Sequence, residues 1–227
     1  MRWLAASLGL SALCLSAAAL LAACSSAPAV PDWQLTAKGA LDRSVQAYLQ
    51  GDSRLGTVEF AVARRELSRT GQADLLARAE LTRCAARVAS LVFEGCAGFA
   101  PLAADANPAQ RAYADYLQAQ NKPQDTALLP AQHRPFAAGQ PSLDSLKAVR
   151  DPLAQLVAAA VLLQSGRAEP GVLLLAVDTA SAQGWSRPLL AWLNAQLMRA
   201  KAAADAPQSA QLERRIALVS KAGPTRP

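Results

Sequence analysis

Helix start and stop signals recur along residues 32–221, and they limit this chain to short helical segments. Asp32 and Ser53 are residues that favour the N-cap position, and Asn107-Pro108 pairs a cap with proline at the first helical position. Glycines follow several of the apolar segments, as expected at helix ends. These signals predict helices over about 33–50, 54–69, 72–90, 108–120, 152–165, 169–182, 187–204 and 207–221, with a short one starting at Ser142.

The composition favours an all-α fold. Hydrophobic residues make up 52% of the chain but aromatic residues only 5%, because alanine supplies much of the apolar content. Alanine is the best helix former, and few segments show the alternation of a strand. We therefore expect an all-α domain over residues 32–221, built from helical hairpins packed as a regular array or as an irregular bundle.

Two stretches depart from regular amphipathic helices. Residues 121–141 contain four prolines and predict a long Pro-rich connection with one short helical turn near 127–132. The apolar stretch 153–177 is interrupted by polar residues and two turn signals, so we expect two buried helices there, not a membrane span. Residues 222–227 are expected to form a disordered tail.

Two segments of the chain resemble each other. "YLQGDSRLGTVEFAVARREL" and "LLQSGRAEPGVLLLAVDTAS" both run from an apolar helix through a tight turn into a second helix. The corresponding positions are Gly56 and Gly171, Phe60 and Leu175, and Ala63 and Asp178. The pattern resembles the helical hairpin of tetratricopeptide repeats (TPR), where a small residue lets two helices touch. The usual Trp-x2-Leu-Gly and a strict 34-residue period do not occur, so a different helical bundle remains the alternative.

The N-terminus has the form of a secretory signal. Arg2 is followed by the uncharged segment 3–23, a basic region followed by an apolar one. The segment ends in Leu21-Ala22-Ala23-Cys24, which resembles the lipobox of bacterial lipoproteins. The resemblance implies cleavage before Cys24, a diacylglycerol group on its thiol, and a further acyl chain such as palmitate on its amine. An ordinary signal peptide or an uncleaved anchor are the alternatives.

The same resemblance predicts where the protein lies. Residues 1–23 would be the signal peptide and residues 24–31 a lipidated N-terminus and flexible tether, because "SSAPAVP" cannot build a core. In lipoproteins of this kind, aspartate after the cysteine favours retention at the inner membrane, whereas here the residue is Ser25. We therefore expect attachment to the outer membrane, facing the periplasm.

The remaining cysteines predict a disulfide. With Cys14 removed in the signal and Cys24 lipidated, Cys84 and Cys96 are left in an oxidising compartment. One continuous helix would separate them by about 18 Å, whereas a disulfide needs Cα atoms within about 7 Å. We therefore expect the helix to end near Ser90 and the chain to fold back. Two free buried thiols are the alternative, and the spacing does not fit a redox-active Cys-x-x-Cys pair.

The charge pattern argues against nucleic-acid binding. The formal net charge is +6, but arginines are interleaved with acidic residues. Asp74 and Arg78, and likewise Glu80 and Arg83, have the spacing of ion pairs on one helix face. We expect these faces to be solvated, with no nucleic-acid partner.

No pattern for catalysis or metal binding occurs in the sequence. The one histidine, His133, lies among prolines and is expected to be an exposed loop residue. A single histidine without a cluster of cysteines or acids is a poor metal site. The nucleophile, zinc and phosphate-loop motifs are absent. We therefore expect a protein that is not an enzyme and that uses no cofactor and no metal.

Aromatic residues are the remaining candidates for binding. Core packing explains Trp33, Trp185 and Trp192 without any binding role, and a partner groove is the functional alternative. In that alternative Trp185, in the turn "QGWSRP", is expected to be the most exposed tryptophan, and Tyr113 and Tyr116 line the same concave groove. The sequence thus predicts a lipoprotein that acts as a protein-interaction or envelope-assembly module. The chain resembles uncharacterised proteobacterial lipoproteins, and this resemblance does not imply any particular activity. A cell-wall-modifying enzyme or an activator of one is the alternative, and a surface antigen or adhesin comes third.

Overall fold

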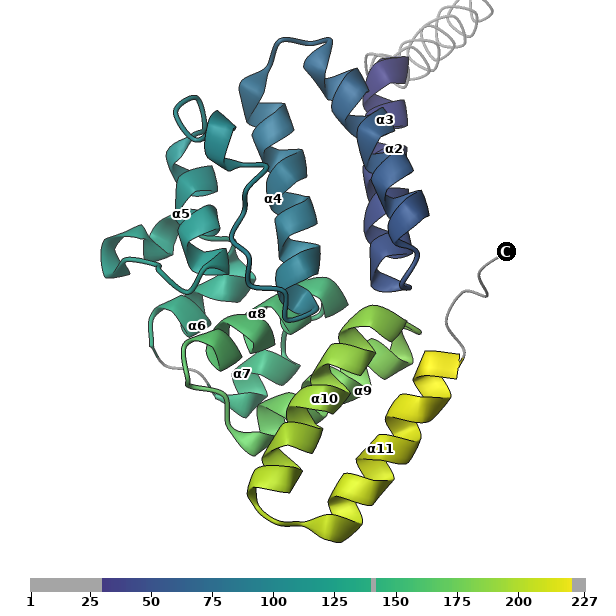
Figure 1. The fold of residues 1–227 in the computed structure, drawn as a ribbon. Coiled ribbons are helices and arrows are strands. Elements are labelled where there is room, and N and C mark those ends of the chain that lie inside the picture. Colours follow the sequence, from purple (N-terminus) through teal and green to yellow (C-terminus); the bar gives the residue numbers. More distant parts are fainter. Residues whose placement is uncertain (1–29, 140–141, 222–227) are drawn as a thin grey trace, which may run out of the picture. The chain divides into compact units, whose positions relative to one another are not determined.

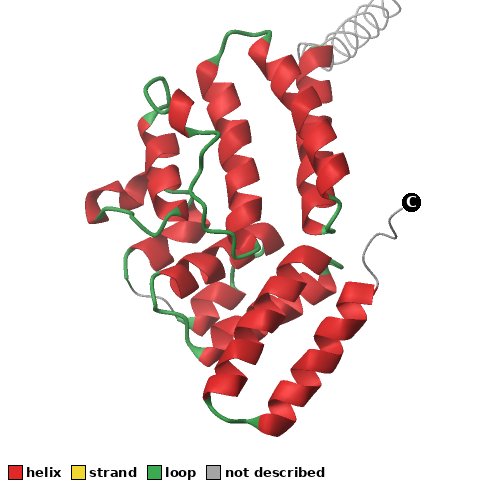
Figure 2. Cartoon of the chain, viewed as in Figure 1, coloured by secondary structure: helices red, strands yellow, loops and turns green. Residues whose placement is uncertain are grey.

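Helices begin and end close to the capping residues of the sequence. The computed structural model describes residues 30–139 and 142–221, which contain α-helices, short 3₁₀ helices and no β-strand (Figures 1 and 2). The all-α prediction is confirmed. The α-helices are α2 (Asp32–Leu49), α3 (Ser53–Ser68), α4 (Ala73–Ala89), α5 (Pro108–Leu117), α6 (Arg134–Ala137), α7 (Leu143–Lys147), α8 (Pro152–Gln164), α9 (Pro170–Ala182), α10 (Ser186–Ala202) and α11 (Ala206–Lys221).

Short polar side chains cap these helices. Asn107 and Gln110 form a reciprocal capping box at the start of α5, and proline follows the cap. At α3 the cap is Asp52, whose carboxylate accepts a hydrogen bond from the backbone N–H of Leu55 at 2.9 Å. The prediction placed this cap one residue later, at Ser53, which instead is the first residue of the helix.

The Pro-rich connection is more ordered than the sequence suggests. It contains the 3₁₀ helices η3 (Pro123–Leu128) and η4 (Ala131–His133), followed by α6. The prediction of one short turn was incomplete because Leu129, His133 and Phe136 are buried, and each holds the connection against the core. Proline fixes the backbone between these anchors without requiring hydrogen bonds of its own.

The core is centred on α8, as its apolar sequence predicted. Nine of its residues are buried, and four of them are alanine. It packs against α4 on one side and α9 on the other, while α10 lies between α9 and α11 (Figure 1). Small side chains let these helices approach closely, which explains how a chain with few aromatic residues still fills its core.

The two similar segments use their glycines differently. A Cβ atom on Gly56 would lie 3.3 Å from the carbonyl oxygen of Ser44, so α2 and α3 touch at this glycine. Ser44 also donates its hydroxyl to the Gly56 carbonyl at 2.7 Å. A Cβ atom on Gly171 would instead meet the side chain of Leu143 in α7, at 2.8 Å. Gly56 thus lies at a close contact between the two helices of its own hairpin, whereas Gly171 lies against a side chain of α7.

The turn between α9 and α10 holds the turn between α2 and α3. The Trp185 indole N–H donates to the Gln46 side chain at 3.1 Å, and the Ser186 hydroxyl donates to the Gln50 carbonyl at 2.7 Å. The Arg187 guanidinium donates to the Tyr48 carbonyl at 2.6 Å and lies 4.3 Å from the centre of the Tyr48 ring. These contacts join the first helices of the domain to the last ones.

Three predicted segments lie outside the described residues. These are the signal peptide at 1–23, the lipidated part of the tether with Cys24, and the tail at 222–227. Within 30–139 and 142–221, no helix is both long and apolar enough to span a bilayer.

Candidate functional site

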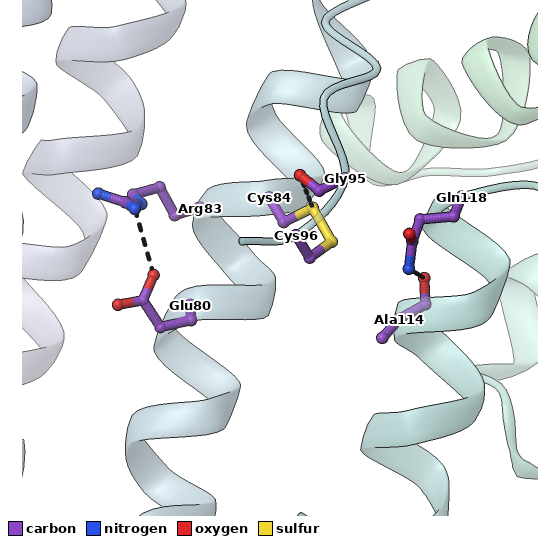
Figure 3. The surroundings of a disulfide bond; sticks show 7 residues. All are labelled: Glu80, Arg83, Cys84, Gly95, Cys96, Ala114 and Gln118. Carbon is purple, nitrogen blue, oxygen red and sulfur yellow. Dashed lines mark hydrogen bonds and ion pairs between the residues drawn. A yellow bond between two sulfur atoms is a disulfide. The ribbon is translucent and has the colours of Figure 1, made fainter. Parts of the chain in front are cut away.

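Cys84 and Cys96 form a disulfide, as the sequence predicted (Figure 3). Their sulfur atoms are 1.96 Å apart and their Cα atoms 5.4 Å apart. Helix α4 ends at Ala89 with Ser90 as its C-cap, so the helix stops where the bridge requires it to stop. The bridge closes a reversal of the chain against the last turns of α4.

The reversal begins at Leu91. This residue has a φ of 58°, in the left-handed region that side chains with a Cβ atom rarely adopt. The backbone N–H of Val92 then donates to the Arg87 carbonyl at 3.0 Å, which closes the end of the helix. Leu91 itself is partly buried against the core. The bend is therefore held by side-chain burial and by the disulfide, where many helices use glycine.

A buried carboxylate lies beside the disulfide. Glu80 is only 2% exposed, and its carboxylate lies 2.5 Å from Arg64 of α3. It also lies 3.4 Å from Arg83 (Figure 3). The Glu80/Arg83 pair was predicted, but the prediction that this face is solvated is wrong for Glu80. The reason is that α3 packs over α4 at this position, and Phe60 of α3 lies under the Arg83 guanidinium at 4.3 Å.

The Glu80 carboxylate packs directly against Gly98. A Cβ atom at position 98 would be 2.0 Å from Glu80 Oε2 and 2.6 Å from its carboxyl carbon. We expect Gly98→Ala to lower the free energy of unfolding by about 1–3 kcal/mol, because the carboxylate must move away from its arginines. Urea denaturation measures this change.

A double-mutant cycle provides the control for Gly98→Ala. In a Glu80→Ala background the clash is removed, so the added cost of Gly98→Ala should fall to within about 0.5 kcal/mol of zero. An equal cost in both backgrounds would show that Gly98 matters for another reason, such as its backbone conformation.

His133 is buried, which contradicts the prediction of an exposed loop residue. It is 1% exposed, and its ring centre lies 4.9 Å from that of Tyr116 and 5.6 Å from that of Tyr113. The two tyrosines project from α5, and the Pro-rich connection carries His133 under them. Within the described residues, Tyr116 Oη and His133 Nδ1 are buried without a hydrogen-bond partner. No local pattern predicts this cluster, because it depends on how the connection folds back.

Burial makes His133 a pH-dependent element of stability. Desolvation lowers its pKa from 6.5 to about 4, although nearby Asp151 acts in the opposite direction. Between these values the unfolded chain binds the proton and the folded chain does not, so stability falls as pH decreases from 6.5 toward 4. We expect a loss of about 2 kcal/mol between pH 7.5 and pH 5.

The measurement is urea denaturation at both pH values, compared with His133→Gln. His133 is the one histidine of the chain, so the difference between the two pH profiles isolates its titration from that of the carboxylates. Parallel profiles would contradict the assignment.

The predicted aromatic groove is not formed by these residues. Trp185 is 5% exposed and Tyr116 is fully buried, so the expectation that they are available to a partner is wrong. Trp185 is buried because its indole N–H pairs with Gln46 of α2. Tyr113 is partly buried and stacks with Tyr116 at 6.2 Å. These aromatic side chains serve as packing and hydrogen-bonding groups of the fold.

The remaining clusters of polar residues are small. No group of three or more histidine, cysteine, aspartate or glutamate residues is placed to hold a metal ion in the ranges that the structure covers. A cavity of about 190 Å³ lies beside the disulfide, bordered by Glu80, Arg83, Arg87 and both cysteines. Its arginines already pair with Glu80 and Glu94. This cavity therefore offers no free charge for a ligand.

Comparison with known proteins does not assign the chain to a family. No family model, curated protein or solved structure matches this sequence. The described residues form an all-α protein in which a disulfide closes the chain reversal at the end of α4.

Proposed function

We propose that this protein is an outer-membrane lipoprotein whose helical domain faces the periplasm and binds other envelope proteins. The observation that carries the proposal is the Cys84–Cys96 disulfide in a chain whose first residues resemble a lipoprotein signal. Disulfides persist in oxidising compartments and are rare in the cytosol. The bridge thus supports the export that the lipobox at Cys24 predicts.

Binding is favoured over catalysis by the way the polar side chains are used. Glu80 is paired with arginines, and His133 is enclosed by tyrosines. Neither side chain is presented to a substrate. The tandem packing of α8 to α11 is typical of helical proteins that bind partners along their outer faces.

One candidate surface for a partner lies on the last helices, although Leu35 of α2 and Val58 of α3 are exposed to a similar extent, 58% and 56%. Leu174 of α9, Met198 of α10 and Leu218 of α11 are 55%, 73% and 71% exposed. Large apolar side chains at such exposure are candidates for contacts in a complex. These residues replace the predicted groove of Trp185, Tyr113 and Tyr116 as the sites at which to look for a partner.

Site-specific photocrosslinking in cells tests the proposal. A photoreactive amino acid at Met198 or Leu218 should give a discrete adduct with an envelope protein, identified by mass spectrometry. The same amino acid at Arg214, an exposed polar position of α11, is the matched control and should give a weaker adduct. If neither apolar position gave a discrete adduct at native expression, the binding role would be wrong.

A further inference from the structure

An apolar pocket lies between α4, α5 and the residues that join η3 to η4. Its volume is about 410 Å³, within the range of about 300–1,000 Å³ that is typical of small-molecule sites. The floor consists of Leu81 from α4, Tyr113 from α5 and Leu129 from the connection. Leu81 and Leu129 are 4% and 1% exposed, so the floor is part of the core. The pocket thus offers an apolar surface backed by rigid elements.

One charged side chain borders this pocket. Arg78 lies on the rim and is exposed. All 17 aspartate and glutamate residues of the chain lie within the described ranges, yet none of them is within 4 Å of the Arg78 guanidinium. The predicted Asp74/Arg78 pair is therefore wrong. A cation without a carboxylate partner beside an apolar floor is complementary to an anion that carries an apolar group.

Most of the other polar groups of the rim are already engaged, apart from the side-chain NH2 group of Asn107. Gln110 accepts from the Asn107 backbone N–H and donates to the Asp74 carbonyl at 2.8 Å. The Asn107 side-chain oxygen accepts from the Gln110 backbone at 2.9 Å, and the Thr82 hydroxyl donates to the Arg78 carbonyl at 2.9 Å. A peptide would bring backbone amides that need partners here, and burying them unpaired is costly. The rim therefore favours a ligand with one anionic group and few other polar atoms.

Tyr113 carries no negative charge that would repel an anion in the pocket. Burial raises the pKa of its phenol, with a smaller contribution from Asp151 in the same direction. The ring thus stays neutral and contributes its apolar surface to the floor.

We propose that this pocket binds a single-chain anionic amphiphile, such as a medium-chain fatty acid. The carboxylate pairs with Arg78, and the hydrocarbon chain lies over Leu81, Tyr113 and Leu129. Most of the affinity comes from burial of the hydrocarbon chain, and Arg78 sets the orientation. The proposal does not depend on the anchor at Cys24, because it rests on residues of the folded domain alone.

Photoaffinity labelling tests the site directly. The full chain, reconstituted in nanodiscs of phosphatidylcholine, is irradiated with a fatty acid that carries a diazirine near its chain end. Labelled peptides should map to residues 78–82, 109–113 and 128–130, and decanoate should compete more effectively than decanol. Labelling spread evenly over the surface, or concentrated outside these residues, would overturn the proposal.

Two variants distinguish the role of charge from that of folding. Arg78→Gln should reduce labelling about three- to fivefold, the range of an exposed ion pair, while the thermal unfolding curve stays unchanged. Arg54→Gln, at an exposed arginine of α3 that is also without an ion pair, is the matched control and should leave labelling unchanged. Equal labelling of Arg78→Gln and Arg54→Gln would contradict the assigned ligand. Competition by a short peptide with an apolar C-terminal residue that is as strong as competition by decanoate would contradict it too.

Discussion

Replacing Cys84 and Cys96 with serine should lower the free energy of unfolding by about 3 kcal/mol. The bridge links residues 12 positions apart, and in the chain-entropy model a loop of this size restricts the unfolded chain by about that amount. Besides the bridge, the reversal beyond α4 is held by the partly buried Leu91 and by an ion pair between Arg87 and Glu94, and residues 92–99 contain no regular helix. Loss of the bridge should therefore destabilise the bend at residues 90–99 first.

Urea denaturation of the oxidised wild type and of the double variant measures the effect. Ala97→Ser, an exposed substitution of similar size beside Cys96, is the control and should cost less than about 0.5 kcal/mol. Thiol titration of the denatured, unreduced wild type should find neither Cys84 nor Cys96 reactive. Two reactive thiols would show that the bridge does not form in the cell, and a double variant as stable as the wild type would contradict the predicted stabilisation.

Hydrogen exchange locates the loss along the chain. In the double variant, the amides of residues 90–99 should lose protection before those of α8, because the bend contributes few buried contacts apart from Phe99. A uniform loss across both regions would indicate instead that the bridge stabilises the whole domain cooperatively.

The helices could be predicted because their signals are local. Asn107 with its proline, Ser142 and Asp151 each cap the helix that follows within one residue of the sequence-based boundary. The chain reversal at Ser90 was predictable for a different reason. A covalent distance limit applies whatever the surrounding fold is, so the cysteine spacing alone excluded a continuous helix.

Burial of polar and aromatic residues could not be predicted in the same way. His133 and Trp185 each follow turn signals, and turns are usually exposed, yet both pack under distant segments. Glu80 has the sequence spacing of a surface ion pair, but α3 covers it and adds Arg64 as a second partner. In each case the deciding contact comes from a residue at least 16 positions away along the chain, which no local pattern encodes.

At the apolar pocket, the local sequence pattern predicted a contact that the fold does not contain. Arg78 has a carboxylate four residues before it, the usual arrangement of a helical ion pair, yet the two side chains do not pair. Asp74 instead contributes its backbone carbonyl to Gln110, which fixes α5 against α4. The helix spacing alone therefore does not decide whether the two side chains pair.

Cys24→Ser should release the protein from the membrane. If the chain is a lipoprotein, the acyl groups on Cys24 provide the attachment. Two or more acyl chains hold a protein firmly, whereas their absence leaves no comparable attachment. The expected result is a shift of the protein from the membrane fraction to the fraction soluble without detergent. Ser26→Ala, two residues on, is the matched control and should fractionate as the wild type does.

Intact-mass spectrometry of the wild-type protein from isolated membranes is the most direct measurement. The expected mass is that of a chain beginning at Cys24 plus a diacylglycerol group and one further acyl chain, and this addition is missing from Cys24→Ser. A wild-type protein that carries no acyl mass, or that begins at any other residue, would contradict lipid anchoring and remove the basis for placing its partners in the envelope.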